Sequence, residues 1–275
     1  MLISDSKLER ALAPHLERVL IVDHAPASTR MLIELLHNIH RGKVWNGTST
    51  AQAVSMAQTA NPQIVFTDYL GPDIDGLAFT RALRRSGFTS RKVPVIMVTA
   101  QATPGAILGA RDSGVHEFLR KPYTNKDLLR RLEAALLRPR SWVEAVGYIG
   151  PDRRRFNSGE YQGARKRRSD TTQNSDEADA VQALRIVASA VNAIEVDPQQ
   201  AFRSLRAQAE DLQRAAEAMG NQSLKSAAEE LQAKLTAVGS PERMTSADLE
   251  PLRKRLMTFL PTAAAKPAQA SRPAA

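Results

Sequence analysis

The sequence predicts an α/β fold, a doubly wound parallel sheet of five strands, followed by a separate all-α helical bundle. Up to about residue 138, short apolar runs alternate with segments of helical periodicity. Such alternation is typical of a parallel sheet with helices on both faces. From residue 176 to residue 260 the apolar residues recur only at helical spacings. The length of 275 residues is enough for about two domains.

Five short apolar runs predict the strands of the sheet. They cover residues 19–22, 44–45, 64–66, 95–98 and 115–119. The runs are rich in β-branched residues and nearly continuous, as parallel strands buried on both faces require. Helix-length segments such as Thr29 to Ile39 and Asn125 to Leu137 follow the strands. We therefore expect an α/β domain over residues 16–138, preceded by an amino-terminal extension of residues 1–15.

A basic linker is expected between the two domains. Residues 139–175 lose periodicity and are rich in Gly, Arg, Ser and Asp, which is typical of a flexible connection. From Arg138 to Arg168 nine basic residues stand against three acidic ones, so this segment holds +6 of the formal net charge of +9. The positive charge of the chain is therefore concentrated in the linker.

The second domain, residues 176–260, is predicted to contain about four helices. Two apolar stripes alternate spacings of three and four, one from Phe202 to Met219 and one from Leu224 to Val238. Asp197 before Pro198 predicts a helix start, and glycines 220 and 239 stand where left-handed C-caps are common. Residues 261–275 are rich in Ala and Pro and are expected to be disordered.

Composition excludes several classes of protein. No apolar stretch approaches the ~18 residues of a membrane span. The amino terminus lacks the basic and long apolar regions of a secretory signal, so we expect a cytoplasmic protein. Because the chain has no cysteine, disulfides, thiolate catalysis and thiolate metal sites are excluded.

Polar residues stand at the end of four predicted strands. Asp23 follows the first strand, Asp68 the third, Thr99 the fourth and Lys121 the fifth. The carboxyl ends of parallel strands meet at one edge of the sheet, so these residues should form one site. Two carboxylates can hold Mg²⁺, and a carboxylate can attack a phosphoryl group. An ammonium and a hydroxyl would meet the charge that spreads over the phosphoryl oxygens. The pattern therefore favours acyl-phosphate chemistry.

Four motifs in order resemble the receiver domain of two-component response regulators. They are Val22-Asp23, Asp68-x-x-x-Pro72-x-x-Asp75-Gly76, Thr99-Ala100 and Phe118-x-x-Lys121-Pro122. The resemblance covers about residues 16–138. It implies a flavodoxin-like sheet in the order 2-1-3-4-5 and phosphorylation by a histidine kinase or phosphotransfer protein.

The same resemblance assigns roles to single residues. Asp68 is the implied phosphoacceptor, and the backbone carbonyl of Leu70 joins the carboxylates on the metal. Ala100 stands with Thr99 among the ligand-binding residues. Phe118 reports phosphorylation by turning inward from an exposed position as Thr99 moves to the phosphate.

One residue departs from the family pattern at the metal. Receivers usually carry two adjacent acids after the first strand, and here the second position is His24, at a place that often touches the metal. Imidazole is a poor partner for Mg²⁺ and a better one for softer transition metals. His24 is therefore either a bystander or a changed metal ligand. A second change, Gly71 where the family commonly has Met, concerns the loop.

Three hypotheses about the function of the whole chain remain open. In the first, phosphorylation controls a helical domain that binds an unknown protein partner. In the second, arginines beside Phe156 and Tyr161 in the linker bind nucleic acid, although no recognition helix follows. In the third, His24 has turned the receiver fold into a scaffold that is not phosphorylated.

The helical region itself suggests two further interpretations. The stretch around Glu210 faintly resembles a degenerate histidine-phosphotransfer hairpin, with Glu210 where the phosphorylated histidine would stand. All five histidines precede residue 139, so this region cannot accept phosphate on imidazole. The apolar stripes predict either a bundle core or the seam of a homodimer.

Overall fold

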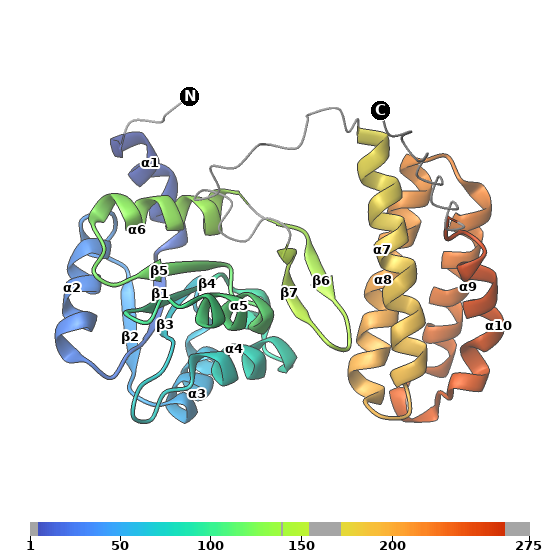
Figure 1. Ribbon diagram of the computed structural model, residues 1–275, viewed down its shortest axis with the longest axis horizontal. Coiled ribbons are helices and arrows are strands. Elements are labelled where there is room, and N and C mark those ends of the chain that lie inside the picture. Colours follow the sequence, from blue (N-terminus) through green and yellow to red (C-terminus); the bar gives the residue numbers. More distant parts are fainter. Residues whose placement is uncertain (1–4, 139, 154–171, 262–275) are drawn as a thin grey trace, which may run out of the picture. The chain divides into compact units, whose positions relative to one another are not determined.

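The computed structural model describes residues 5–138, 140–153 and 172–261. It divides the chain into two compact units. The first unit comprises Met1–Val143 and Gly147–Gly163, and the second comprises Glu144–Val146 and Ala164–Ala275. Figure 1 shows a sheet with helices in the first unit and a bundle of helices in the second.

The first unit contains a five-stranded sheet whose strands are all parallel. Its strands are β1 (Arg18–Val22), β2 (Lys43–Gly47), β3 (Ile64–Asp68), β4 (Val95–Thr99) and β5 (Glu117–Arg120). The strand order is β2-β1-β3-β4-β5, and every neighbouring pair is parallel. The predicted α/β class and the implied strand order are confirmed.

Helices cover both faces of this sheet (Figure 1). They are α2 (Pro26–His37), α3 (Thr50–Ala60), α4 (Gly76–Arg85), α5 (Pro104–Ser113) and α6 (Asn125–Leu132), with 3-10 turn η2 (Thr89–Lys92) and π-helical turn η3 (Glu133–Leu137). Successive residues of β1 serve opposite cores, because side chains alternate along a strand. Val19 and Ile21 pack with α2 and α6, and Leu20 and Val22 pack with α3, α4 and α5.

The amino-terminal extension is part of this domain. It forms α1 (Asp5–Leu12) and a 3-10 turn, η1 (Ala13–His15). Leu8, Leu12 and Leu16 are buried in the core that also contains α2 and α6. The four-residue spacing of Leu8 and Leu12 puts them on one face of α1, and Leu16 follows the 3-10 turn, so all three leucines reach the same core.

The expected linker contains a two-stranded hairpin. Strands β6 (Trp142–Glu144) and β7 (Ile149–Pro151) pair with each other, so the expectation of a flexible connection does not hold for residues 142–151. Arg140 donates to the carbonyl of Asp152 at 3.1 Å, and the Tyr148 hydroxyl donates to the carbonyl of Pro151 at 2.6 Å. Residues 154–171, which include Phe156 and Tyr161, lie outside the described residues.

The second unit is built from four long helices in its described part, as predicted. They are α7 (Thr172–Ala193), α8 (Pro198–Ala218), α9 (Gln222–Val238) and α10 (Ser246–Met257), with a 3-10 turn η5 (Pro241–Arg243) before the last. The side chain of Asp197 accepts from the amide of Gln200 at 3.2 Å and so caps α8. Gly220 and Gly239 both have φ of 66°, the left-handed conformation expected at helix ends.

The two predicted apolar stripes form the core of this bundle. Phe202, Leu205 and Leu212 of the first stripe and Leu224, Leu231 and Leu235 of the second are all buried within one chain. These six side chains are covered by their own chain, so the alternative in which they form the seam of a homodimer is wrong. Glu210 is exposed on α8.

Buried polar side chains of α8 bind the short segment Glu144–Val146. The amide of Gln200 donates to the Glu144 carboxylate at 3.1 Å, and that of Gln208 donates to the Glu144 carbonyl at 3.3 Å. Since buried polar groups are costly unless they are paired, these bonds account for the glutamines inside the bundle. Among the described helices, none combines the length and apolar character needed to cross a bilayer. The predicted tail from residue 262 onward lies outside the described residues.

Candidate functional site

The four polar residues predicted at the strand ends lie at one edge of the sheet. Val22 pairs with Thr67, so Asp23 and Asp68 are the next residues along two neighbouring strands. On the other side, Thr99 pairs with Arg120, the residue before Lys121. Parallel pairing therefore brings together side chains that are nearly a hundred residues apart in sequence.

Lys121 lies between the two carboxylates. Its ammonium donates to Asp23 Oδ2 at 2.9 Å and to Asp68 Oδ2 at 3.3 Å. The other oxygen of each carboxylate accepts from a backbone amide at 2.8 Å, that of Ala25 for Asp23 and that of Tyr69 for Asp68. Asp23 and Asp68 are 6% and 8% exposed, so the ammonium and the two amides replace most of their water.

The environment keeps Asp23 ionised. Burial acts to raise the pKa of Asp23, but hydrogen bonds from Ala25, Lys121 and Ser28 outweigh it and lower the pKa. Burial, followed by the nearby charge of Asp23, raises the pKa of Tyr123 to about 12. Asp23 therefore carries a full negative charge at neutral pH beside Asp68.

Thr99 and Ala100 lie at the same edge, on β4 and just after it. Thr99 is 3% exposed, and its hydroxyl oxygen accepts from the amide of Gln101 at 3.0 Å. A hydroxyl that accepts one hydrogen bond can still donate one. Ala100 is exposed in the loop that follows β4.

The loop after Asp68 is held by a glycine that tolerates no side chain. The amide of Gly76 donates to the carbonyl of Tyr69 at 3.0 Å, and a Cβ on Gly76 would lie 2.0 Å from the Asp68 carbonyl oxygen. Asp75 caps α4 by accepting from the amide of Ala78 at 2.8 Å. The Asp-Gly step thus turns the chain back into a helix directly beside Asp68.

A divalent cation fits the residues at this edge. Asp23, His24 and Asp68 each offer one ligand atom, and within the described residues these atoms all lie within 4.8 Å of one another. Donors that share one cation at about 2.0–2.6 Å are separated by no more than about twice that distance. Leu70 follows in the loop, where it forms an isolated bridge with Asp75, and its carbonyl remains a predicted ligand.

Phe118 differs from its predicted position. Its side chain is 3% exposed and packs in the core with α3, α4 and α5. The exposed starting position predicted for Phe118 is therefore wrong for the structure described, and a movement of the ring on phosphorylation stays a prediction. The first three residues of β5 are buried, so the Phe118 ring lies among apolar side chains.

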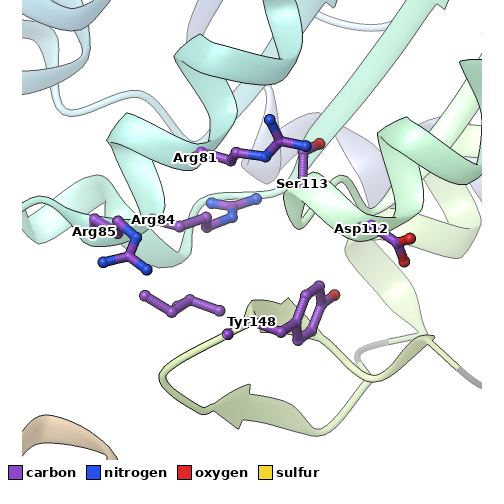
Figure 2. Close-up of a pocket in the computed structure, with 8 residues that line it drawn as sticks. Arg81, Arg84, Arg85, Asp112, Ser113 and Tyr148 are labelled. Atoms are coloured by element: carbon purple, nitrogen blue, oxygen red, sulfur yellow. The ribbon is translucent and has the colours of Figure 1, made fainter. Parts of the chain in front are cut away.

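A second cluster of charged residues was not predicted. Figure 2 shows Arg81, Arg84, Arg85, Asp112, Ser113 and Tyr148 around a cavity of about 80 Å³ between α4, α5 and the hairpin. Arg84 is fully buried, and its guanidinium donates to the carbonyls of Arg91, Val93 and Gly114. It also lies 3.3 Å from Nδ1 of His116 and 5.3 Å from the ring of Trp142.

The bonds of Arg84 define a structural role for this cluster. Desolvation lowers the pKa of Arg84 to about 9, and the neutral acceptors around it satisfy the donors that burial removes from water. The carboxylate of Asp112 accepts from Arg111 at 3.0 Å and from Arg153 at 2.9 Å. The guanidinium of Arg84 therefore ties the end of α4 to the segments before β4 and β5, and it lies over the ring of Trp142 from the hairpin. No local sequence signal separates Arg84 from an ordinary basic residue at a helix end.

Comparison with known proteins agrees with the site. The sequence model of the family described as response regulator receiver domain matches residues 19–133. Protein PilH of Pseudomonas aeruginosa is 29% identical over 119 residues, which are 43% of this chain and 97% of PilH. The DNA-binding response regulator MtrA of Mycolicibacterium smegmatis is 30% identical over 128 residues, which are 44% of this chain and 51% of MtrA. The chain thus spans nearly all of PilH and about half of MtrA.

Solved structures were also compared. The chemotaxis protein CheY4 of Vibrio cholerae has 24% sequence identity and a TM-score of 0.41, over 44% of this chain and 99% of CheY4. From the family match and the relatives, residues 19–133 are a response regulator receiver domain. This is the class of domain found in two-component, phosphorelay signal transduction.

Proposed function

We propose that the chain is a response regulator of a phosphorelay in which Asp68 accepts the phosphoryl group. The donor would be a histidine kinase or a phosphotransfer protein, and a cytoplasmic location follows from such a donor. The observation that carries the proposal is the buried Asp68 carboxylate at the sheet edge, 3.3 Å from the Lys121 ammonium and beside an ionised Asp23.

The side chains support a simple phosphoryl transfer. An oxygen of Asp68 attacks the phosphorus, the bond from phosphorus to the donor breaks, and the electron pair leaves with the donor. Lys121 is close enough to move from the carboxylates to the incoming phosphoryl oxygens, and the Thr99 hydroxyl and the loop at Ala100 would meet the same charge. When bound, a divalent cation such as Mg²⁺ supplies positive charge that offsets the repulsion between phosphate and carboxylates. Asp23, Asp68, His24 and the Leu70 carbonyl would hold it.

The chain would therefore act as a phosphoacceptor and not as an enzyme on another substrate, beyond its own phosphorylation and dephosphorylation. Output would pass through the helical unit to a protein partner. Because Phe118 is already buried, the signal would arise from Thr99 and Lys121 moving toward the phosphate.

Neither alternative is favoured. The nucleic-acid hypothesis rests on the arginines beside Phe156 and Tyr161, and residues 154–171 lie outside the described residues. The DNA binding in the name of MtrA belongs to that protein, of which this chain matches about half. The scaffold hypothesis requires a damaged site, yet Asp23, Asp68, Thr99 and Lys121 are all present at one edge.

Incubation with acetyl phosphate and a divalent cation tests the proposal. Intact-mass spectrometry should show the gain of one phosphoryl group on the wild-type chain and none on Asp68→Asn. Asp73→Asn is the matched control, because Asp73 is an exposed acid in the same loop. Phosphorylation that persists in Asp68→Asn would refute the assignment.

A further inference from the structure

We infer that His24 changes the ion preference of this site, so that it selects a first-row transition-metal dication such as Co²⁺ over Mg²⁺. The inference rests on the proposed function in that it concerns the same cation, but it is a statement about binding and needs no phosphoryl transfer. It is carried by the position of the imidazole, by the residue that makes room for it and by the chemistry of the donors.

The imidazole lies where a ligand is needed. Nδ1 of His24 is 4.0 Å from Asp23 Oδ1, and ligand atoms of Asp23, His24 and Asp68 are mutually within 4.8 Å. A cation at about 2.0–2.2 Å from nitrogen and oxygen donors needs those donors about 3–4 Å apart, so only a small adjustment is required. The side chain of His24 is 41% exposed and can make that adjustment without disturbing the core.

Gly71 provides the space for the imidazole. A Cβ at position 71 would lie 2.6 Å from Nδ1 of His24, closer than real contacts allow, and 3.1 Å from Cε1, which is a tight contact. Gly71 does not have a positive φ, so the backbone does not require glycine there. His24 and Gly71 therefore act as a pair, in which the missing side chain lets the ring nitrogen face the carboxylates.

The donor set determines the preference. Mg²⁺ requires oxygen ligands in a near-ideal octahedron and keeps its water, whereas imidazole nitrogen suits transition metals. With Asp23 and Asp68 the site offers two carboxylate oxygens and one nitrogen, a mixed set that retains the charge needed for any dication. The nitrogen therefore changes selectivity while the carboxylates provide most of the attraction.

Competition from Lys121 does not alter this preference. The ammonium contacts both carboxylates at 2.9 and 3.3 Å, so any dication must displace it. That displacement weakens binding of Mg²⁺ and Co²⁺ equally, because both carry the same charge. It cancels when affinities are compared as a ratio.

Calorimetric titration of the full chain with Co²⁺ and with Mg²⁺ tests the inference. We compare the dissociation constant for Mg²⁺ divided by that for Co²⁺. This ratio should be at least about tenfold larger in the wild type than in His24→Asp, because loss of a residue that only supports a metal ligand already costs about tenfold in affinity, and His24→Asp removes the ligand itself. His37→Asn, which removes an exposed histidine at the end of α2, should leave the wild-type ratio unchanged.

Two further measurements make the result specific. Gly71→Ala alone should move the ratio of dissociation constants toward the value found in His24→Asp. In the double variant Gly71→Ala with His24→Asp the ratio should equal that of His24→Asp alone, because the two residues act as a pair. Mn²⁺ bound to the wild type should show a ¹⁴N coupling by pulsed electron paramagnetic resonance that His24→Asp lacks. Equal ratios in wild type and His24→Asp, no ¹⁴N coupling, or no binding of either ion would each overturn the inference. Because the acetyl phosphate experiment reads covalent phosphate on Asp68, its failure is distinguishable from failure here.

Discussion

Replacement of Lys121 by methionine should destabilise the first unit, because it leaves two buried carboxylates without their cation. Methionine retains the unbranched apolar stem of lysine and removes the ammonium. The lost contacts are those to Asp23 at 2.9 Å and to Asp68 at 3.3 Å. At an effective dielectric constant of about 20, each contact corresponds to roughly 5 kcal/mol of attraction before desolvation is subtracted.

The net effect is smaller than this attraction. Removing one partner of a buried ion pair destabilises a protein by about 3–5 kcal/mol, since the charge that remains is unpaired. Lys121 is 21% exposed, so water screens part of the interaction. We therefore expect the free energy of unfolding to fall by about 3 kcal/mol at neutral pH. The loss should shrink when a divalent cation takes the place of the ammonium, because binding to the native state stabilises it.

Urea unfolding followed by tryptophan fluorescence measures this loss in the first unit alone. The chain has two tryptophans, Trp45 on β2 and Trp142 on β6, and both belong to that unit. Lys126→Met is the control, because Lys126 is an exposed lysine on α6. The reasoning is refuted if Lys121→Met and Lys126→Met shift the unfolding midpoint equally.

Two other predictions concern the hairpin side of the first unit. Burial, followed by Arg84 and Arg140, lowers the pKa of His116 well below 6.5, so the neutral ring contributes stability that is complete above that pH and is lost as the pH falls. Between about pH 7 and pH 5 the free energy of unfolding of the wild type should therefore fall more steeply than that of His116→Asn, by up to about 1.4 kcal/mol per pH unit, and urea unfolding at each pH measures the difference. Gly114→Ala places a Cβ 2.4 Å from the Ile149 carbonyl oxygen at φ of 93°, and should cost about 1–3 kcal/mol in urea unfolding. Gly105→Ala meets no atom within 4 Å and should be neutral or stabilising by up to about 1 kcal/mol; the reverse order of the two variants would contradict this account.

The sheet and its edge could be predicted because the signals are local. Apolar runs mark the strands, and the polar residue after each run marks its carboxyl end. Parallel pairing then brings those residues together, as the pairing of Val22 with Thr67 shows for Asp23 and Asp68. The bundle could be predicted for the same reason, since its buried faces repeat at helical spacing along each helix.

The hairpin and the burial of Arg84 could not be predicted in this way. Arg84 stands in the last turn of an amphipathic helix, where a basic residue is ordinarily exposed. It is buried because residues some sixty positions later, Trp142 and Tyr148 among them, pack over it. By contrast, the four-residue spacing of Leu8, Leu12 and Leu16 is a local signal, and it is sufficient to predict that the extension folds onto the core.

Phe118 shows a different limit. Its motif indicates that the ring belongs to the site, but a motif does not indicate which of two rotamers is populated. That choice depends on the packing of α4 and α5 around β5, which involves residues far apart in the sequence. The ring packs among apolar side chains, and its position in the phosphorylated domain remains a prediction.

Chemical trapping of the phosphorylated residue tests the central claim most directly. After incubation with acetyl phosphate, borohydride reduces an acyl phosphate to an alcohol, which converts a phosphorylated aspartate into homoserine and releases phosphate. Peptide mapping should find homoserine at position 68 in the wild-type chain, and none there when acetyl phosphate is omitted. Homoserine at position 23, 73 or 75 with Asp68 intact, or phosphate that survives borohydride on a hydroxyl group, would contradict the assignment of Asp68 as the phosphoacceptor.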